Sequence, residues 1–431
     1  MPPSPPPTSD ASSRATARWR DRAISRRDAL AATGSAAVAA LAGCLGTDAS
    51  AATVNAAPWP MQGYDAGRTN HRADAKPPRS DLAVAWRGDL PERWPSTRQP
   101  VAYDDLVVVP NDGVVGLDRE DGSERFALHP TERGLAVAAA DGYRTPTLVT
   151  GSTSTVLGLD ATGGVDTGVG KRVAERWQVG GDDDGPFPGG LLGGDDVLAG
   201  TTPVAADGVV YHASPDAAVV ARDAASGRER WRHVGERGGG FFAVGEHVYV
   251  ATFGESVRAL DPADGRVVWT HRERDGDPNR WTGVSAADGD VFVNDGRGVT
   301  ALDATDGGRV RWRSGDGERT DVRTDYGVPT VVDDRVLLSG FDAVYGFDRE
   351  TGERVWKRAL DPTDPRHVAA AGDLAFVPTE GDGLVALHAA TGRTAWEFAP
   401  PDAWEVGPPV VADGRLYAVA GNALVCLEGS R

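Results

Sequence analysis

The residues best suited to chemistry are carboxylates, and several of them crowd one stretch of the chain. Asp182, Asp183 and Asp184 are followed, after a Gly-rich run, by Asp195 and Asp196. Carboxylate oxygens are ligands that calcium prefers, and the ion takes six to eight oxygens. Acidic runs occur throughout this chain, however, so a solvated loop is the interpretation we favour. We therefore predict no metal site.

The patterns of phosphate, zinc and nucleophilic chemistry are not met. The segment GVDTGVGKR, residues 164–172, resembles a phosphate loop, but its glycine spacing is one residue too long and Arg172 stands where Ser or Thr would hold magnesium. The eight histidines form no H-E-x-x-H pattern or close pair, and no G-x-S-x-G turn occurs. We assign no catalytic residue, and we expect the histidines to be packing or surface residues.

The two cysteines suggest different roles. Cys426 lies in the apolar run LVCL and reads as a small core residue. Cys44 ends the run LAGC, which resembles a lipobox, the motif at which a bacterial or archaeal lipoprotein precursor is cleaved and lipid-modified. With Cys44 lipidated, neither a disulfide nor a cysteine metal site is possible.

The segment before Cys44 has the order of an export signal. Six arginines precede an apolar run from Ala29 to Ala42, which is shorter than the ~20 residues of a membrane span. The sequence SRRDAL resembles the twin-arginine motif, with Arg26 and Arg27 as its pair. We predict a signal peptide over 1–43, a flexible tether over 44–57 and anchoring outside the cytoplasm; the alternative is an ordinary secretory signal with a chance cysteine.

Charge favours a saline habitat and excludes a nucleic-acid partner. Formal charge is −18, and it becomes −21 without residues 1–43, which carry six Arg and three Asp. The only lysines are Lys76, Lys171 and Lys357. A dense carboxylate surface with Arg as the main cation resembles haloarchaeal secreted lipoproteins, and molar salt shortens the Debye length to ~3 Å, which screens the self-repulsion. A basic patch for nucleic acid is lacking.

The stretch VRALDPADGRVVW, residues 257–269, indicates which secondary structure carries the residues discussed above. Its apolar runs flank a turn in which the Asp261 carboxylate can accept a backbone N–H two residues on, Pro262 presets φ and Gly265 can adopt a positive φ. Two strands joined by a hairpin are predicted.

This hairpin recurs with a period near forty residues, which indicates a repeat protein. The turn positions are Asp118, Asp160, Asp223, Asp261, Asp303 and Asp348, then His388 and Glu428. The closing aromatics are Phe126, Trp177, Trp231, Trp269, Trp312, Trp356 and Trp396, with Trp86 unpaired ahead of the first copy. A further strand pair precedes most turns. The prediction is an all-β, eight-bladed propeller of four-stranded antiparallel blades, closed by an N-terminal strand that completes the last blade.

The repeat resembles the pyrroloquinoline quinone (PQQ)-like propeller repeat of quinoprotein dehydrogenases and of BamB-type assembly lipoproteins. The opening WPMQGYDAGRTNH, residues 59–71, is similar to the segment that precedes the first blade in such proteins, and the resemblance covers residues 58–431 as one domain. It implies that the repeat tryptophans pack blade against blade.

The resemblance leaves two functions open. A PQQ-dependent dehydrogenase of this family binds the quinone at the ring centre with calcium and a catalytic carboxylate, and the large alcohol dehydrogenases add a disulfide between adjacent cysteines. No adjacent cysteines occur here, and we match no residue to the calcium or catalytic positions. We therefore favour a non-catalytic scaffold that binds no cofactor and contacts unidentified protein partners.

A contact face is suggested by large aromatics that precede the first strand of several blades. They are Trp94, Phe241, Trp281, Tyr326 and Trp404. Residues at strand starts lie on the connections that rim one face of the ring, where exposed aromatics are typical contact anchors. The competing interpretation is that they cap the blade ends.

Overall fold

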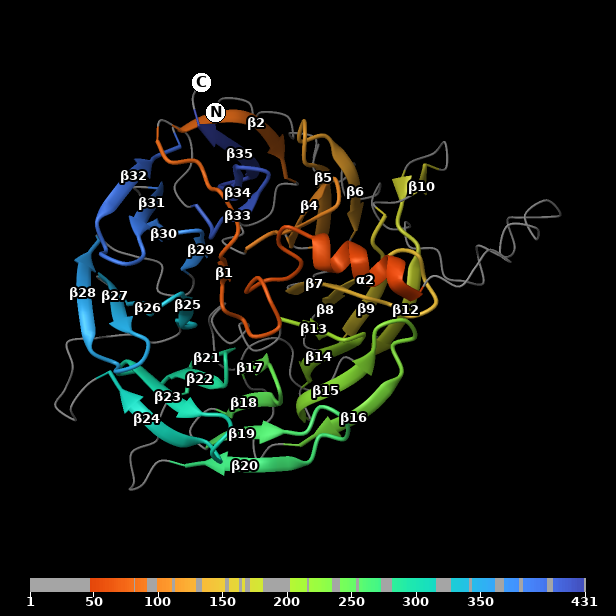
Figure 1. The fold of residues 1–431 in the computed structure, drawn as a ribbon. Coiled ribbons are helices and arrows are strands. Elements are labelled where there is room, and N and C mark those ends of the chain that lie inside the picture. Colours follow the sequence, from red (N-terminus) through yellow and green to blue (C-terminus); the bar gives the residue numbers. More distant parts are fainter. Residues whose placement is uncertain are drawn as a thin grey trace, which may run out of the picture.

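Eight four-stranded antiparallel sheets form a closed ring, as the repeats predict (Figure 1). The computed structural model describes residues 47–80, 82–90, 99–110, 113–128, 134–151, 155–162, 165–166, 171–180, 202–214, 217–234, 241–252, 256–272, 281–314, 327–340, 343–360, 368–379, 383–400 and 406–429.

Within each blade the strands run in chain order from the ring centre outward. Blade 1 comprises β3 (Val101–Tyr103), β4 (Leu106–Pro110), β5 (Val114–Asp118) and β6 (Glu124–Leu128). Blade 2 comprises β7 (Gly134–Ala138), β8 (Thr147–Gly151), β9 (Thr155–Asp160) and β12 (Glu175–Gly180). Blade 3 comprises β13 (Val204–Ala206), β14 (Val209–Ser214), β15 (Ala217–Asp223) and β16 (Glu229–His233), and blade 4 comprises β17 (Phe241–Val244), β18 (Val248–Thr252), β19 (Ser256–Leu260) and β20 (Val267–His271).

Blades 5 to 7 follow the same plan. They comprise β21 (Gly283–Ala287), β22 (Asp290–Asn294), β23 (Val299–Asp303) and β24 (Arg309–Arg313); β25 (Thr330–Val332), β26 (Arg335–Ser339), β27 (Ala343–Asp348) and β28 (Arg354–Ala359); and β29 (Ala369–Ala371), β30 (Leu374–Thr379), β31 (Gly383–His388) and β32 (Thr394–Phe398). A small hairpin, β10 (Val165–Asp166) with β11 (Lys171–Arg172), is inserted before β12 in blade 2.

Blade 8 joins the two ends of the described chain. Its inner strands are β33 (Val410–Ala412), β34 (Arg415–Ala420) and β35 (Ala423–Gly429), and its outermost strand is β2 (Leu82–Asp89). β2 pairs antiparallel with β35, from Leu82 opposite Gly429 to Asp89 opposite Ala423. The predicted closure by an N-terminal strand is therefore confirmed.

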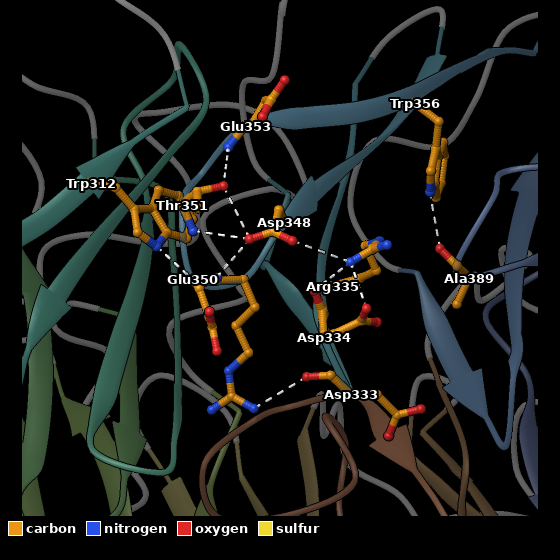
Figure 2. Close-up of polar contacts among 11 residues, drawn as sticks. Trp312, Asp333, Asp334, Arg335, Asp348, Glu350, Thr351, Glu353, Trp356 and Ala389 are labelled. Atoms are coloured by element: carbon orange, nitrogen blue, oxygen red, sulfur yellow. Dashed lines mark hydrogen bonds and ion pairs between the residues drawn. The ribbon is translucent and has the colours of Figure 1, made fainter.

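The repeated turn between the third and fourth strands is built by its aspartate. Asp348 Oδ1 accepts the backbone N–H groups of Glu350 at 3.1 Å and Thr351 at 3.0 Å, and Gly352 completes the turn at φ +73° (Figure 2). The hydrogen bonds from Thr351 hold the pKa of the Asp348 carboxyl below its ordinary value. The same bond to a backbone N–H forms, at 2.8–3.0 Å, at Asp118, Asp160, Asp223, Asp261 and Asp303.

The repeat tryptophans join neighbouring blades. Their indole N–H groups donate to backbone carbonyl oxygens of the next blade at 2.8–3.3 Å: Trp86 to Arg119, Trp177 to Ala224, Trp231 to Pro262, Trp269 to Ala304, Trp312 to Arg349, Trp356 to Ala389 and Trp396 to Pro78. The ring of Trp312 also lies against Gly352, where a Cβ would overlap it. Turn and tryptophan thus form one contact between blades.

The ring has two faces, which we name by their loops. The turn face carries the turns between the first and second strands and between the third and fourth strands of the blades. The connection face carries the turns between the second and third strands and the links from blade to blade. Helix α2 (Thr47–Ala56) contacts β3 and β7 and lies over the turn face (Figure 1). This helix occupies most of the stretch expected to be a flexible tether.

We predict that the tryptophan contact contributes measurably to stability. Trp356→Phe keeps an aromatic side chain but removes the N–H that donates to Ala389 and part of the indole volume, so we expect the free energy of unfolding to fall by about 1 kcal/mol or somewhat more. Trp356→Ala, which also leaves a cavity, is expected to cost about 3–5 kcal/mol. Denaturant titration at constant salt measures both.

Val355→Ala is the matched control, since Val355 adjoins Trp356 on β28 and is 46% exposed. We expect its effect to stay within about 0.5 kcal/mol. Equal losses in Trp356→Phe and Val355→Ala would contradict the assigned role of the indole hydrogen bond.

Candidate functional site

The middle of the ring is occupied by residues 59–72, the central segment (Figure 1). The segment begins beside blade 1, where the backbone N–H of Trp59 donates to the Ala102 carbonyl oxygen at 2.9 Å. The Trp59 side chain is fully buried. The segment then follows the inner strands around the ring. It ends as β1 (His71–Arg72), which pairs in parallel with β29.

Backbone hydrogen bonds tie the central segment to six blades. Besides the Trp59 bond, N–H groups of inner strands donate to its carbonyl oxygens at 2.7–2.9 Å. These pairs are Val137 to Pro60, Val244 to Ala66, Ala286 to Gly67, Val331 to Thr69, Ala370 to Asn70 and Gly372 to Arg72. An inner strand has an unpaired edge toward the ring axis, so the segment satisfies donors that would otherwise lack a protein partner.

Buried side chains fix the segment further. Gln62 Nε2 donates to the Gln99 carbonyl oxygen, and Gln99 Oε1 accepts the N–H of Gly63, both at 2.8 Å. Arg72 Nη1 reaches the Val411 carbonyl oxygen of blade 8 at 3.4 Å. Burial lowers the pKa of the Arg68 guanidinium to about 10, which leaves it charged at neutral pH. Side-chain as well as backbone hydrogen bonds therefore hold the central segment in the middle of the ring.

A cavity of about 550 Å³ opens between the central segment and blades 4 to 6. Its charged lining is mainly acidic: Asp65, Glu246, Asp288, Asp290 and Asp333 face one arginine, Arg349. Tyr249 and backbone of the first turns complete the wall. The cavity lies on the turn face, since its blade residues come from first turns and from the third turn of blade 6.

The carboxylates of this cavity differ in environment. Arg349 Nη2 is 2.9 Å from Asp288 Oδ2 and anchors to the Ala287 carbonyl oxygen. Burial raises the pKa of Asp65, although Thr69 donates two hydrogen bonds to it. Desolvation likewise raises the pKa of Asp290. A cationic group suits such a lining better than an anionic one.

The predicted contact aromatics are only partly described. Trp281 is 1% exposed and Phe241 is 8% exposed, and both belong to the cluster between blades 4 and 5. Neither is an exposed contact residue, because the neighbouring blade covers its ring; the capping interpretation fits these two. Trp94, Tyr326 and Trp404 lie outside the described residues.

Several other predicted positions also lie outside the described residues. They are Arg26, Arg27, Cys44 and the acidic stretch from Asp182 to Asp196. Cys426 is buried in β35. His212 is buried with its Nδ1 2.9 Å from the Ala213 carbonyl oxygen, and its Nε2 accepts from Arg222. Desolvation lowers the pKa of His212 to about 4, so it is a neutral packing residue at pH 7.

No group of three or more His, Cys, Asp or Glu among the described residues is arranged to hold a metal ion. Nor is any described helix long and apolar enough to cross a membrane.

The comparisons with known proteins agree with this architecture. A family model described as "Outer membrane protein assembly factor BamB" matches residues 165–344 and 340–428, more than half of the chain. The chain belongs to this family.

Individual relatives match over parts of their length. The BamB of Bordetella pertussis is 29% identical over 211 residues, which cover 43% of this chain and 50% of that protein. The quinohemoprotein alcohol dehydrogenase ADH IIB of Pseudomonas putida is 29% identical over 244 residues, 47% of this chain and 34% of the enzyme. The chain thus spans half or less of the length of these curated relatives.

Solved structures show the same propeller. BamB from Moraxella catarrhalis superposes with a TM-score of 0.57 at 18% identity, covering 81% of this chain and 98% of that one. The quinohemoprotein alcohol dehydrogenase from Comamonas testosteroni gives 0.63 at 16% identity, covering 86% and 81%. These identities show the fold alone, because one propeller serves both binding proteins and enzymes.

We predict that Gly67 is required for the central segment to pack against the inner strand β21. A Cβ on Gly67 would overlap the Ala286 carbonyl oxygen, so Gly67→Ala should displace the segment from β21 at a cost of about 1–3 kcal/mol. The backbone N–H groups of Ala286 and Val331 donate to this segment, so their hydrogen exchange should be faster in Gly67→Ala than in the unmodified protein.

Gly245→Ala is the control, since its Cβ would meet nothing closer than Tyr249 at 3.4 Å. Unchanged exchange in Gly67→Ala, or the same acceleration in both variants, would contradict this role.

Proposed function

We propose that this chain is a lipid-anchored, extracytoplasmic binding protein of the BamB type, whose rigid ring contacts partner proteins without catalysing a reaction. The observation that carries the proposal is the central segment, which runs through the middle of the ring and is hydrogen-bonded to six blades. A protein that works through its outer surfaces needs such a rigid frame, whereas a central cofactor needs space.

Family membership supports the location. The two BamB relatives are described as outer membrane protein assembly factors, which places them outside the cytoplasm. The export-signal pattern, the lipobox resemblance at Cys44 and the acidic, Arg-rich composition extend this to an anchored protein of a saline environment.

The second candidate is a PQQ-dependent dehydrogenase, favoured by the match to the alcohol dehydrogenase of Pseudomonas putida. We place it second because the central segment is hydrogen-bonded along the inner strands of six blades, where a cofactor at the ring centre would need space. We derive no reaction step for this chain.

The absence of a quinone function is testable. Purified protein in molar salt, given PQQ and calcium, is expected to keep its melting temperature and to reduce no redox dye, since a ligand shifts stability only where it binds the folded state. A saturable rise in melting temperature together with dye reduction would establish the dehydrogenase instead. Calcium without PQQ is the control.

The anchor is testable separately. Cys44→Ala removes the proposed lipidation site, so the variant should leave the membrane fraction, because acyl chains supply the membrane affinity. The matched variant Cys426→Ala should remain bound. Undiminished membrane retention of Cys44→Ala would refute the lipid anchor. A released protein that still binds its partner proteins and keeps the stability of the ring would leave the binding role intact.

A further inference from the structure

Helix α2 ties the start of the described chain to one face of the ring. It contacts β3 and β7, the innermost strands of blades 1 and 2. Val54 packs against the core cluster that contains Tyr103 and Leu135, and the N–H of Ala57 donates to the Val54 carbonyl oxygen at 3.1 Å. Trp59 pairs antiparallel with Ala102 of β3, which runs toward the turn face, so the chain that precedes Trp59 lies on the turn-face side of the ring.

The distance from this helix to the proposed anchor is limited by the covalent chain. Cys44 lies three residues before Thr47, the first residue of α2. At a maximum of about 3.6 Å per residue, the anchor lies within about 11 Å of the helix start. Such a spacer cannot carry the lipid around the ring to the other face, since a five-residue strand such as β4 alone spans about 17 Å.

We infer that the turn face of the ring, with α2 nearest, is held against the lipid bilayer and that the connection face points away from it. The inference rests on the proposed lipid anchor. In this arrangement the lipid surface contacts the turn face, and the connection face stays accessible to soluble partners.

The charge of the turn face makes this contact dependent on salt. The ten residues of α2 include one charged residue, Asp48. Exposed acids lie on the turn face of the ring, for example Asp141, Glu246 and Asp288. Anionic lipid repels them at low ionic strength, whereas at 1 M salt the Debye length is only ~3 Å. The ring should therefore approach an anionic bilayer more closely as salt rises.

Fluorescence quenching from the bilayer tests the orientation in the lipidated full-length protein. In a Cys426→Ala background, single cysteines carry an environment-insensitive dye at exposed positions on three sides of the ring. Asp141→Cys and Glu246→Cys report on the turn face, Asn422→Cys on the connection face and Gln178→Cys on the outer rim of blade 2. The vesicles contain phosphatidylglycerol and a lipid with a nitroxide on its headgroup.

We expect loss of fluorescence at Asp141→Cys and Glu246→Cys, increasing with salt, and little loss at Asn422→Cys. Stronger quenching at Asn422→Cys, quenching confined to Gln178→Cys, or no quenching in vesicle-bound protein would each overturn the inference. Flotation of the same samples with vesicles checks the anchor itself. Protein that fails to float refutes the proposed anchoring, and with it the basis of the orientation, whereas protein that floats unquenched refutes the orientation alone.

Discussion

The closed propeller depends on one contact that is repeated between neighbouring blades. A tryptophan indole N–H donates to a turn carbonyl oxygen of the next blade, and the indole covers a glycine of the same turn. The contact works because the turn is preorganised. The Asp348 carboxylate accepts backbone N–H groups within its own turn (Figure 2). The next carbonyl oxygen, that of Arg349, accepts the indole N–H of Trp312 at 2.8 Å. Arg335 adds a partner on the other carboxylate oxygen, 3.5 Å away. Each turn thereby serves both its own hairpin and its neighbour.

A ring of such contacts must also close, and the N-terminal residues make the closure. Blade 8 takes its outermost strand from β2, so no hairpin turn joins its third and fourth strands. Pro78 supplies the carbonyl oxygen that Trp396 needs, and Trp86 donates to Arg119 of blade 1. The tryptophan contacts that join blade 8 to blades 7 and 1 therefore both involve residues that precede the first blade in sequence.

The blades could be predicted from sequence because their signals are local. Asp261, Gly265 and Trp269 lie within nine residues of one another, and a recurring turn can be recognised without knowing its neighbours. The central segment could not be predicted, since WPMQGYDAGRTNH makes most of its contacts through backbone groups that carry no side-chain signal. Its partners, such as Ala286 and Ala370, are more than two hundred residues away. The burial of Trp281 agrees with the capping interpretation, and its covering residues come from the adjoining blades 4 and 5.

The central segment also changes how the ring responds to force or ligand. In a repeat array each unit contacts only its neighbours, so a disturbance in one blade is felt mainly by the next. Here one continuous segment is hydrogen-bonded to blades 1, 2, 4, 5, 6 and 7, which links blades that do not touch. Asp65, Gly67 and Thr69 belong both to this segment and to the wall of the acidic cavity. A group that entered the cavity would therefore contact the element that these six blades share.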